Sequence, residues 1–294
     1  MKQLAEFIMR GRPQAMAVAS LATFSLFLAW VGAAAVALLL LRSGLNATLG
    51  AILAALLPAA LWASAGDIGP LTGLFVVVCL AVVLRYSGQW STLLLASPLV
   101  MGVWVATVLH LAPEYVLQLQ SLAEQLFANI KPQLIAAASS VVERERIAAI
   151  SAPSGQQLLG LFAVLQLLMA LLSLLVARWW QAALYNPGGF QQEFHSLRLT
   201  RGQMLTLLAG LLLLSQSDGY ALWSWLFVVP VVIAGLALVH GMAARLALSW
   251  QGLLVFYLFL VGVSAALPLL MMMAIIDSGL DFRARHDGRL SPPQ

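Results

Sequence analysis

Long apolar runs separated by short polar breaks dominate this sequence. A helix that crosses a bilayer needs about 20 mostly apolar residues, because its backbone groups find no water in the hydrocarbon core. Runs of about this length recur at 15–41, 46–65, 70–85, 91–111, 156–179, 203–216, 219–242 and 250–276. The third and sixth runs are short, so six to eight spans are expected. The pattern predicts an all-α, polytopic transmembrane helical bundle of about eight helices.

The first run differs from a cleaved signal peptide. Lys2, Arg10 and Arg12 precede it, as cations precede a secretory signal. The run from Ala15 to Leu41 is about twice as long as the apolar part of such a signal. We therefore expect this run to be retained as one signal-anchor helix.

A polar insert divides the apolar runs into two groups. Pro113 suits the first position of a helix, and the apolar residues after it recur at three- and four-residue steps. These residues are Tyr115, Leu119, Leu122, Leu126 and Ile130. Pro132 should interrupt this helix, and a second, charged piece should follow at 134–150. The pattern predicts an amphipathic helical hairpin on the membrane face, and a lid or partner-docking arm is the alternative.

The chain is expected to form a single membrane domain over residues 1–294. Its parts are N-terminal helices at 1–111, the amphipathic insert at 112–155, C-terminal helices at 156–276 and a polar tail at 277–294.

Composition favours lipid over water as the main solvent. Hydrophobic residues make up 62% of the chain and charged residues only 9%, against about 25% charged in soluble domains. The formal net charge is +4, but no run of five like charges exists, so we expect no nucleic-acid partner. The expected partner is the lipid bilayer, and the sequence is compatible with other membrane proteins and with a small-molecule substrate. The single cysteine, Cys79, allows no intramolecular disulfide.

No catalytic or nucleotide-binding motif is recognisable. The sequence has no Walker-type loop, no Gly-x-Gly-x-x-Gly after a strand, no His-Glu-x-x-His and no Gly-x-Ser-x-Gly. The four histidines, at 110, 195, 240 and 286, lie on separate segments without metal-ligand spacing. We therefore expect neither an enzyme nor a bound metal or cofactor.

Four ionisable residues fall near membrane depth, at His110, His240, Arg245 and Asp277. Each lies near the end of an apolar run, so the simpler interpretation is that its side chain reaches toward the interface. The alternative is a polar site between helices that binds the head group of a substrate.

Small residues recur every four positions in the second apolar run, at Ala51, Ala55, Ala59 and Ala63. Such a stripe lets two helix backbones approach closely in lipid. It predicts either a helix-packing face within this bundle or a docking face for a separate membrane partner.

The most distinctive stretch follows the fifth run. Its candidate residues are Arg178, Trp179, Trp180, Tyr185, Asn186, Pro187, Gly188, Gly189, Phe190, Glu193, His195 and Arg198. Asn-Pro-Gly-Gly is strong turn chemistry, and aromatic residues on both sides suit the membrane interface. Arg198 and Arg201 are placed to meet lipid phosphate or Glu193. The stretch predicts either a structural anchor or a loop that binds a substrate or partner.

This stretch is also similar to a known family of membrane proteins. The residues Trp-Trp-Gln-x-x-Leu-Tyr-Asn-Pro-Gly-Gly-Phe, from Trp179, resemble a proteobacterial branch of the YybS-like family of uncharacterised membrane proteins. The terminal Asp-Ser-Gly-Leu-Asp-Phe-Arg, from Asp277, is similar too. That family is distantly similar to the substrate-binding S components of energy-coupling-factor transporters and to the cell-shape protein MreD. The resemblance implies a compact bundle in a bacterial inner membrane and carries over no binding residue.

These features together predict a substrate-binding or transport component similar to S components. A structural scaffold for envelope or cell-shape machinery, similar to MreD, is the alternative. Eight spans would group both termini with the loops near 67, 112–155 and 217. That side would hold nine Lys or Arg residues against six, so both termini are expected in the cytoplasm.

Overall fold

The computed structural model describes residues 2–217 and 219–284, and all regular structure in them is helical. The elements are α1 (Lys2–Met9), α2 (Arg12–Phe24), η1 (Leu26–Leu28), α3 (Ala29–Ser43), α4 (Leu45–Ser64), α5 (Gly69–Ser87), α6 (Trp90–Leu111), α7 (Pro113–Ala137), α8 (Val141–Ala149), α9 (Gly155–Tyr185), α10 (Gly189–Ser196), α11 (Arg201–Ser215), η2 (Ala221–Ser224), α12 (Trp225–Arg245), α13 (Trp250–Gly262) and α14 (Ala266–Leu280). Asp218, at the turn before η2, His286 and most of the predicted polar tail lie outside the described residues.

Six of these helices are long and apolar enough to cross a membrane. Two bent pairs, α10 with α11 and α13 with α14, bring the count to eight if each pair is one span. The predicted range of six to eight spans and the all-α class are therefore confirmed for the described residues.

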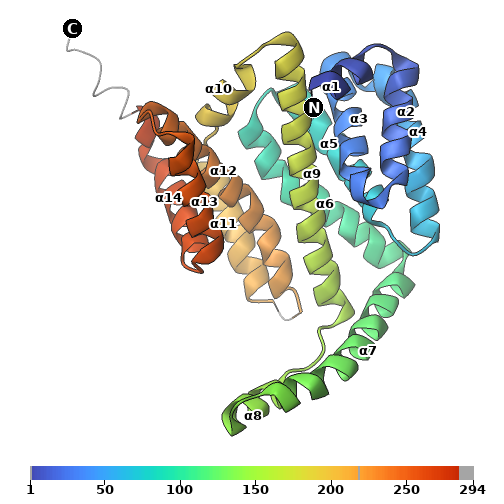
Figure 1. The fold of residues 1–294 in the computed structure, drawn as a ribbon, viewed down its shortest axis with the longest axis vertical. Helices are drawn as coiled ribbons and strands as arrows, with labels where there is room; N and C mark the ends of the chain where they lie inside the picture. Colours follow the sequence, from blue (N-terminus) through green and yellow to red (C-terminus); the bar gives the residue numbers. More distant parts are fainter. Residues whose placement is uncertain (1, 218, 285–294) are drawn as a thin grey trace.

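The longest helix, α9, runs between two groups of helices (Figure 1). Helices α1 to α5 lie on one side of it and α10 to α14 on the other, while α6 crosses behind α9 and contacts both α5 and α12. We call the end of the bundle that carries α1, α10 and the end of α14 the termini end. The opposite end, from which α7 and α8 project, is the insert end.

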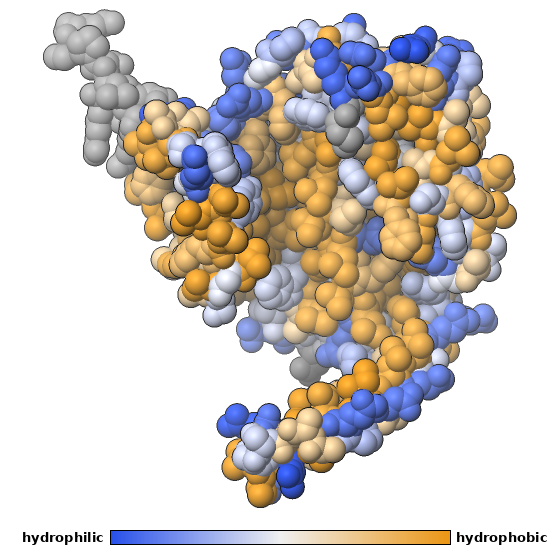
Figure 2. All heavy atoms as spheres, viewed as in Figure 1, coloured by the Kyte–Doolittle hydropathy of each residue, from blue (hydrophilic) through white to orange (hydrophobic). Residues whose placement is uncertain are grey.

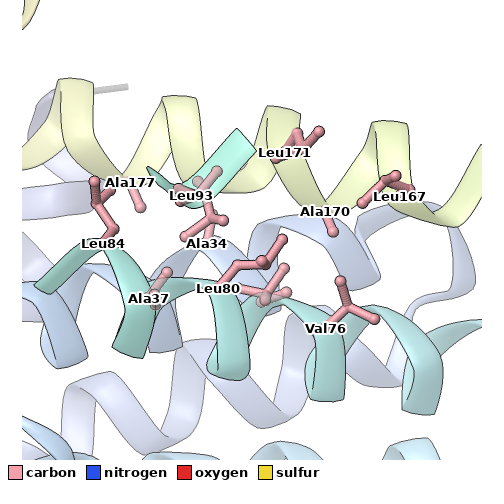
Figure 3. Packing of buried hydrophobic residues seen from close by; sticks show 14 of the residues in the cluster. Ala34, Ala37, Val76, Leu80, Leu84, Leu93, Leu167, Ala170, Leu171 and Ala177 are labelled. Carbon is pink, nitrogen blue, oxygen red and sulfur yellow. The ribbon is translucent and has the colours of Figure 1, made fainter. Parts of the chain in front are cut away.

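Buried aliphatic residues of α9 form the centre of the N-terminal group (Figure 3). Leu167, Leu171 and Leu174 are fully buried, and Ala170 and Ala177 lie on the same helix at seven-residue spacing. Their partners come from three helices and include Ala34, Ala37, Val76, Leu80 and Leu93. Because small and large side chains alternate, the side chains of neighbouring helices interdigitate. This close packing holds the helices together in lipid, where the hydrophobic effect does not drive their association.

The prediction of one long helix over 15–41 is wrong. The chain leaves the helical conformation at Ser25, and α2 and α3 pack against each other as a hairpin. The backbones of α2 and α3 approach each other closely at Gly32, which favours this hairpin. A Cβ atom at this position would lie only 2.9 Å from the Ala19 carbonyl oxygen, so the close approach depends on the glycine. The indole N–H of Trp62 donates to the Phe24 carbonyl over 3.0 Å and satisfies one group at the end of α2.

The last predicted run, 250–276, also breaks into two helices. Between α13 and α14 the axis turns by 117° within three residues, Val263 to Ala265. Both breaks fall in apolar sequence, so the hydropathy of these runs resembles that of single spans.

These two extra reversals change which loops lie at the same end of the bundle as the termini. Arg42 stacks on the Tyr185 ring at 4.2 Å, and Arg85 donates to the Leu40 and Leu41 carbonyls. Both arginines therefore lie at the termini end, beside the α9–α10 turn. The expected grouping of the termini with the loops near 67, 112–155 and 217 is wrong, because those loops lie at the insert end (Figure 1).

The insert forms one long and one short helix. Pro132 does not interrupt α7, which continues to Ala137, because a proline removes one hydrogen bond and bends a helix without necessarily ending it. The break falls later, where the Ser140 hydroxyl accepts from the Glu143 N–H and caps α8. Figure 2 shows the apolar side of this arm toward the bundle and polar residues along its outer edge.

The alanine stripe of α4 packs inside this chain. Ala51, Ala55 and Ala59 are buried, whereas Ala63 is half-buried near the insert end. Helix α4 packs most extensively on α2, whose own buried small residues include Ala15 and Ala19. The stripe is thus a packing face between α2 and α4.

Enlarging this face should destabilise the bundle. We expect Ala55→Leu to lower the free energy of unfolding by about 1–3 kcal/mol, because the extra atoms have no space between α2 and α4. The matched control is Ala60→Leu on the exposed side of α4, with an expected change near zero. Thermal unfolding in detergent measures both, and equal midpoints for the two variants would contradict this packing.

The grouping of loops can be tested by cysteine accessibility. In a Cys79→Ala background, Gln89→Cys and Gln192→Cys should react with an impermeant maleimide from one side of the membrane. Ser64→Cys and Ser139→Cys should react only from the other side. Gln3→Cys on α1 should react from the same side as Gln192→Cys because of the reversal at Ser25, and its labelling from the side of Ser139→Cys would show that this reversal is wrongly placed.

Candidate functional site

A tight turn joins α9 to α10 at the termini end. Gly188 has a φ of 87°, in the left-handed region that glycine adopts without strain. A Cβ atom on Gly189 would lie 2.8 Å from Cγ of Asn186, so the turn also needs a glycine there. Asn186 and Pro187 complete this turn, which folds α10 back against the bundle.

An arginine fork holds α10 against α9. Arg178 donates to both carboxylate oxygens of Glu193, over 2.9 Å from Nε and 2.6 Å from the terminal nitrogen. The indole N–H of Trp90 on α6 approaches the same carboxylate at 3.4 Å. Two parallel N–H donors fix orientation as well as distance, so this pair sets the position of α10. Glu193 therefore pairs with Arg178, and not with Arg198 or Arg201 as expected.

The two other arginines meet the end of α14. Arg198 forms an ion pair with Asp281 at 3.2 Å, and Arg201 donates to the Gly279 carbonyl oxygen over 2.7 Å. The two stretches singled out in the sequence, about eighty residues apart, therefore lie against each other.

A buried ion pair completes this contact. Arg283 and Asp277 meet at 2.6 Å, with side chains 5% and 3% exposed. Arg283 also donates to the His195 and Leu197 carbonyls over 3.0 and 2.8 Å. The expectation that Asp277 reaches toward the interface is wrong, because Arg283 and the backbone N–H of Phe282 satisfy its carboxylate inside the protein. We call Asp277, Asp281, Arg198, Arg201 and Arg283 the C-terminal ion cluster.

Beside this cluster lies a pocket of about 500 Å³ between α9, α10, α12 and α13. Its lining residues are Leu175, Val176, Trp179, Phe190, Gln191, Phe194, His195, His240 and Tyr257. The walls are mostly aromatic and aliphatic, and the polar side chains gather on one side, where α10 faces α12 and α13.

Histidine and tyrosine side chains define the polar side of this aromatic pocket. Nε2 of His240 lies 2.9 Å from the Tyr257 hydroxyl, so one of the two donates to the other. The ring of His195 lies 6.4 Å from that of His240, and Phe194 meets His240 edge-on at 5.8 Å. The arrangement offers hydrogen bonds to a polar group and ring faces to an apolar body.

The predicted loop residues divide into four groups by position. Trp179, Phe190 and His195 line the aromatic pocket. Arg178, Glu193 and Arg198 form the ion pairs that hold its walls, and Asn186, Pro187, Gly188 and Gly189 form the turn. Trp180 is fully buried, and Tyr185 stacks on Arg42.

Sequence reasoning did not connect two of the lining residues with this loop. The sequence pattern marks His240 only as an ionisable residue near membrane depth, and it does not single out Tyr257. Tyr257 lies in a run rich in aromatic residues, Phe256 and Phe259 among them, and nothing in the spacing distinguishes it.

The ionisable residues that the sequence marked near membrane depth do not converge at this site. Among the described residues, no group of three or more His, Cys, Asp or Glu side chains is placed to hold a metal ion. His240 lines the aromatic pocket, but His110 ends α6 at the insert end and Asp277 is engaged by Arg283.

Breaking the buried ion pair should cost far more than breaking the exposed one beside it. We expect Asp277→Asn to lower the free energy of unfolding by about 3–5 kcal/mol, because Arg283 then lacks a counter-charge in a buried site. Asp281→Asn, on the same segment but partly exposed, should cost about 1 kcal/mol or less. Thermal unfolding of the two variants in the same detergent tests this order, and equal losses would contradict it.

Searches against protein-family models, curated proteins and solved structures find no match for this chain. The functional argument therefore rests on the geometry of the aromatic pocket and on the distribution of charge around the bundle.

Proposed function

We propose that this multi-pass membrane protein is a binding component of a transport system, and that it holds a small amphipathic molecule in the aromatic pocket. The observation that carries the proposal is the pocket itself: about 500 Å³, with aromatic walls and a His240–Tyr257 pair on its polar side. Small-molecule sites fall in the range of about 300–1,000 Å³ and combine apolar walls with a few placed polar groups.

The lining of the aromatic pocket indicates which chemical groups its ligand should carry. Trp179, Phe190 and Phe194 offer ring faces and edges to a flat or branched apolar body. His240 and Tyr257 can each donate or accept, so they suit a hydroxyl, carbonyl or carboxyl group at one end. The pocket lies near the termini end of the bundle, so such a molecule would have its polar group near a membrane interface.

The distribution of basic residues supports an orientation in a bacterial inner membrane. Among the described residues, the termini end carries ten Lys or Arg residues: Lys2, Arg10, Arg12, Arg42, Arg85, Arg178, Arg198, Arg201, Arg245 and Arg283. The insert end carries three, Lys131, Arg144 and Arg146. Cytoplasmic ends of membrane helices are enriched in Lys and Arg, so we propose that both termini are cytoplasmic and the insert is not.

The YybS-like resemblance agrees with this proposal, because it relates the chain distantly to substrate-binding S components. The scaffold alternative drew on the alanine stripe as a docking face. Ala51, Ala55 and Ala59 are buried within this bundle, which supports the binding proposal over that alternative.

Native mass spectrometry of the gently solubilised chain tests the proposal. The wild type should retain a small molecule, and His240→Leu should reduce its occupancy about tenfold or more, since a buried polar group of the ligand loses its partner. Tyr257→Phe should weaken binding less, because the ring remains.

Matched controls lie far from the aromatic pocket. His110→Leu at the insert end and Tyr86→Phe, which is 83% exposed, should leave occupancy unchanged. Absence of any small molecule from the wild type, together with co-purification of envelope proteins, would favour the scaffold instead.

A further inference from the structure

A second cavity, of about 280 Å³, lies on the opposite face of α9, toward the insert end. It is enclosed by η1, α3, α5, α9 and the loop before α5. Its lining includes three polar side chains, Asp67, Gln166 and Ser173, and two large aromatic rings, Phe27 and Trp30. No part of the proposed aromatic pocket is shared with it.

Gln166 is the feature that most needs an explanation. It lies eleven residues after the start of α9, a helix long and apolar enough to cross a membrane. Its amide has no hydrogen-bond partner among residues 2–217 and 219–284. Gln166 is half-buried on the cavity lining, so its amide is open to hydrogen bonds with water or a ligand there.

Two glycines of α5 make room for this amide. A Cβ atom on Gly69 would lie 2.9 Å from Asp67 Oδ1 and 2.9 Å from Gln166 Nε2. A Cβ atom on Gly73 would lie 3.6 Å from Gln166 Oε1. The Gly-x-x-x-Gly spacing in α5 therefore brings Asp67 and Gln166 close together on one wall of the cavity.

The lining of this cavity carries a negative charge. Asp67 is the only ionisable side chain among its described lining residues, and one carboxylate oxygen accepts from the Gly69 N–H over 2.8 Å. The second oxygen remains available to a ligand. Carboxylate, amide oxygen and aromatic faces together are the groups that recognise ammonium ions, through charge, hydrogen bonds and ring quadrupoles.

We propose that this cavity is a binding site for a small organic cation, an amine or quaternary ammonium compound. Asp67 supplies the counter-charge, Gln166 a hydrogen-bond acceptor, and Trp30 a ring face. The site differs from the aromatic pocket in position and in charge, so an experiment can contradict either proposal without contradicting the other.

Choline is the probe for this proposal, and 3,3-dimethylbutan-1-ol is its uncharged counterpart of the same shape. With the full chain in a non-ionic detergent, choline chloride should raise the unfolding midpoint saturably, while sodium chloride and the neutral alcohol should not. Asp67→Asn should weaken the apparent affinity for choline about tenfold or more, because the counter-charge is lost. His240→Leu should respond to choline as the wild type does.

A space-filling substitution provides an independent test. Gly73→Leu should abolish the response, because its side chain enters the cavity beside Gln166. Gly102→Leu, whose Cβ atom would meet nothing within 4 Å, is the matched control and should keep the response. The proposal is overturned if the alcohol stabilises the wild type as well as choline does, a comparison that needs no variant to fold. Wild-type affinity in Asp67→Asn would overturn it equally.

Discussion

Close packing along α9 is the interaction on which the rest of this structure depends. In lipid, apolar side chains gain little by leaving the solvent, so helices associate through van der Waals contact and hydrogen bonds. Ala163, Ala170 and Ala177 recur at seven-residue steps on α9, and each is at most 1% exposed. They allow neighbouring helices to approach, while Leu167 and Leu174 fill the space between them. Both cavities border this helix: Ala170 of the packing face lines the smaller one, and Leu175, Val176 and Trp179 line the aromatic pocket.

Charged contacts have a different task at the termini end. A buried pair such as Arg283–Asp277 gains little net stability over apolar packing, because both ions lose their hydration. What it supplies is position: Arg283 reaches the carbonyls of His195 and Leu197, where the chain passes from α10 to α11. Arg178 and Glu193 fix the middle of α10. The wall that carries Phe190, Phe194 and His195 is thereby held at two points.

The sequence predicted the helical class, the range of spans and the loop that borders the aromatic pocket. Those features depend on local composition: apolar runs, the Asn186–Gly189 turn and aromatic residues near interfaces. The reversals at Ser25 and at 263–265 escaped prediction because neither break contains a charge or a proline. They depend instead on tertiary contacts, such as Gly32 against α2. Each missed reversal placed one terminus, with its basic residues, at the wrong end of the bundle, and this obscured the separation of ten basic residues from three.

The site residues that sequence reasoning missed were missed for a related reason. His240 and Tyr257 are seventeen positions apart, and they meet only because the chain turns at 246–249 and sends α13 back along α12. Gln166 and Asp67 are about a hundred positions apart, and both lie beside Gly69. The spacing of residues within one segment cannot predict that two such side chains lie close together, because the second side chain comes from another helix. Polar residues inside apolar runs mark where such sites can form, and the topology decides which of them converge.

The placement of the two cavities on one helix has a mechanical consequence. Gln166 and Ser173 face one cavity, while Leu175, Val176 and Trp179 face the other, so α9 is a wall of both. A ligand in either cavity can influence the other only by moving this helix or its neighbours. Helix α9 is tied to α10 through Arg178, so any axial shift of α9 would also displace Phe190 and His195. If the proposed ligands are coupled, this shared wall is the physical route, because no lining residue is common to the two cavities.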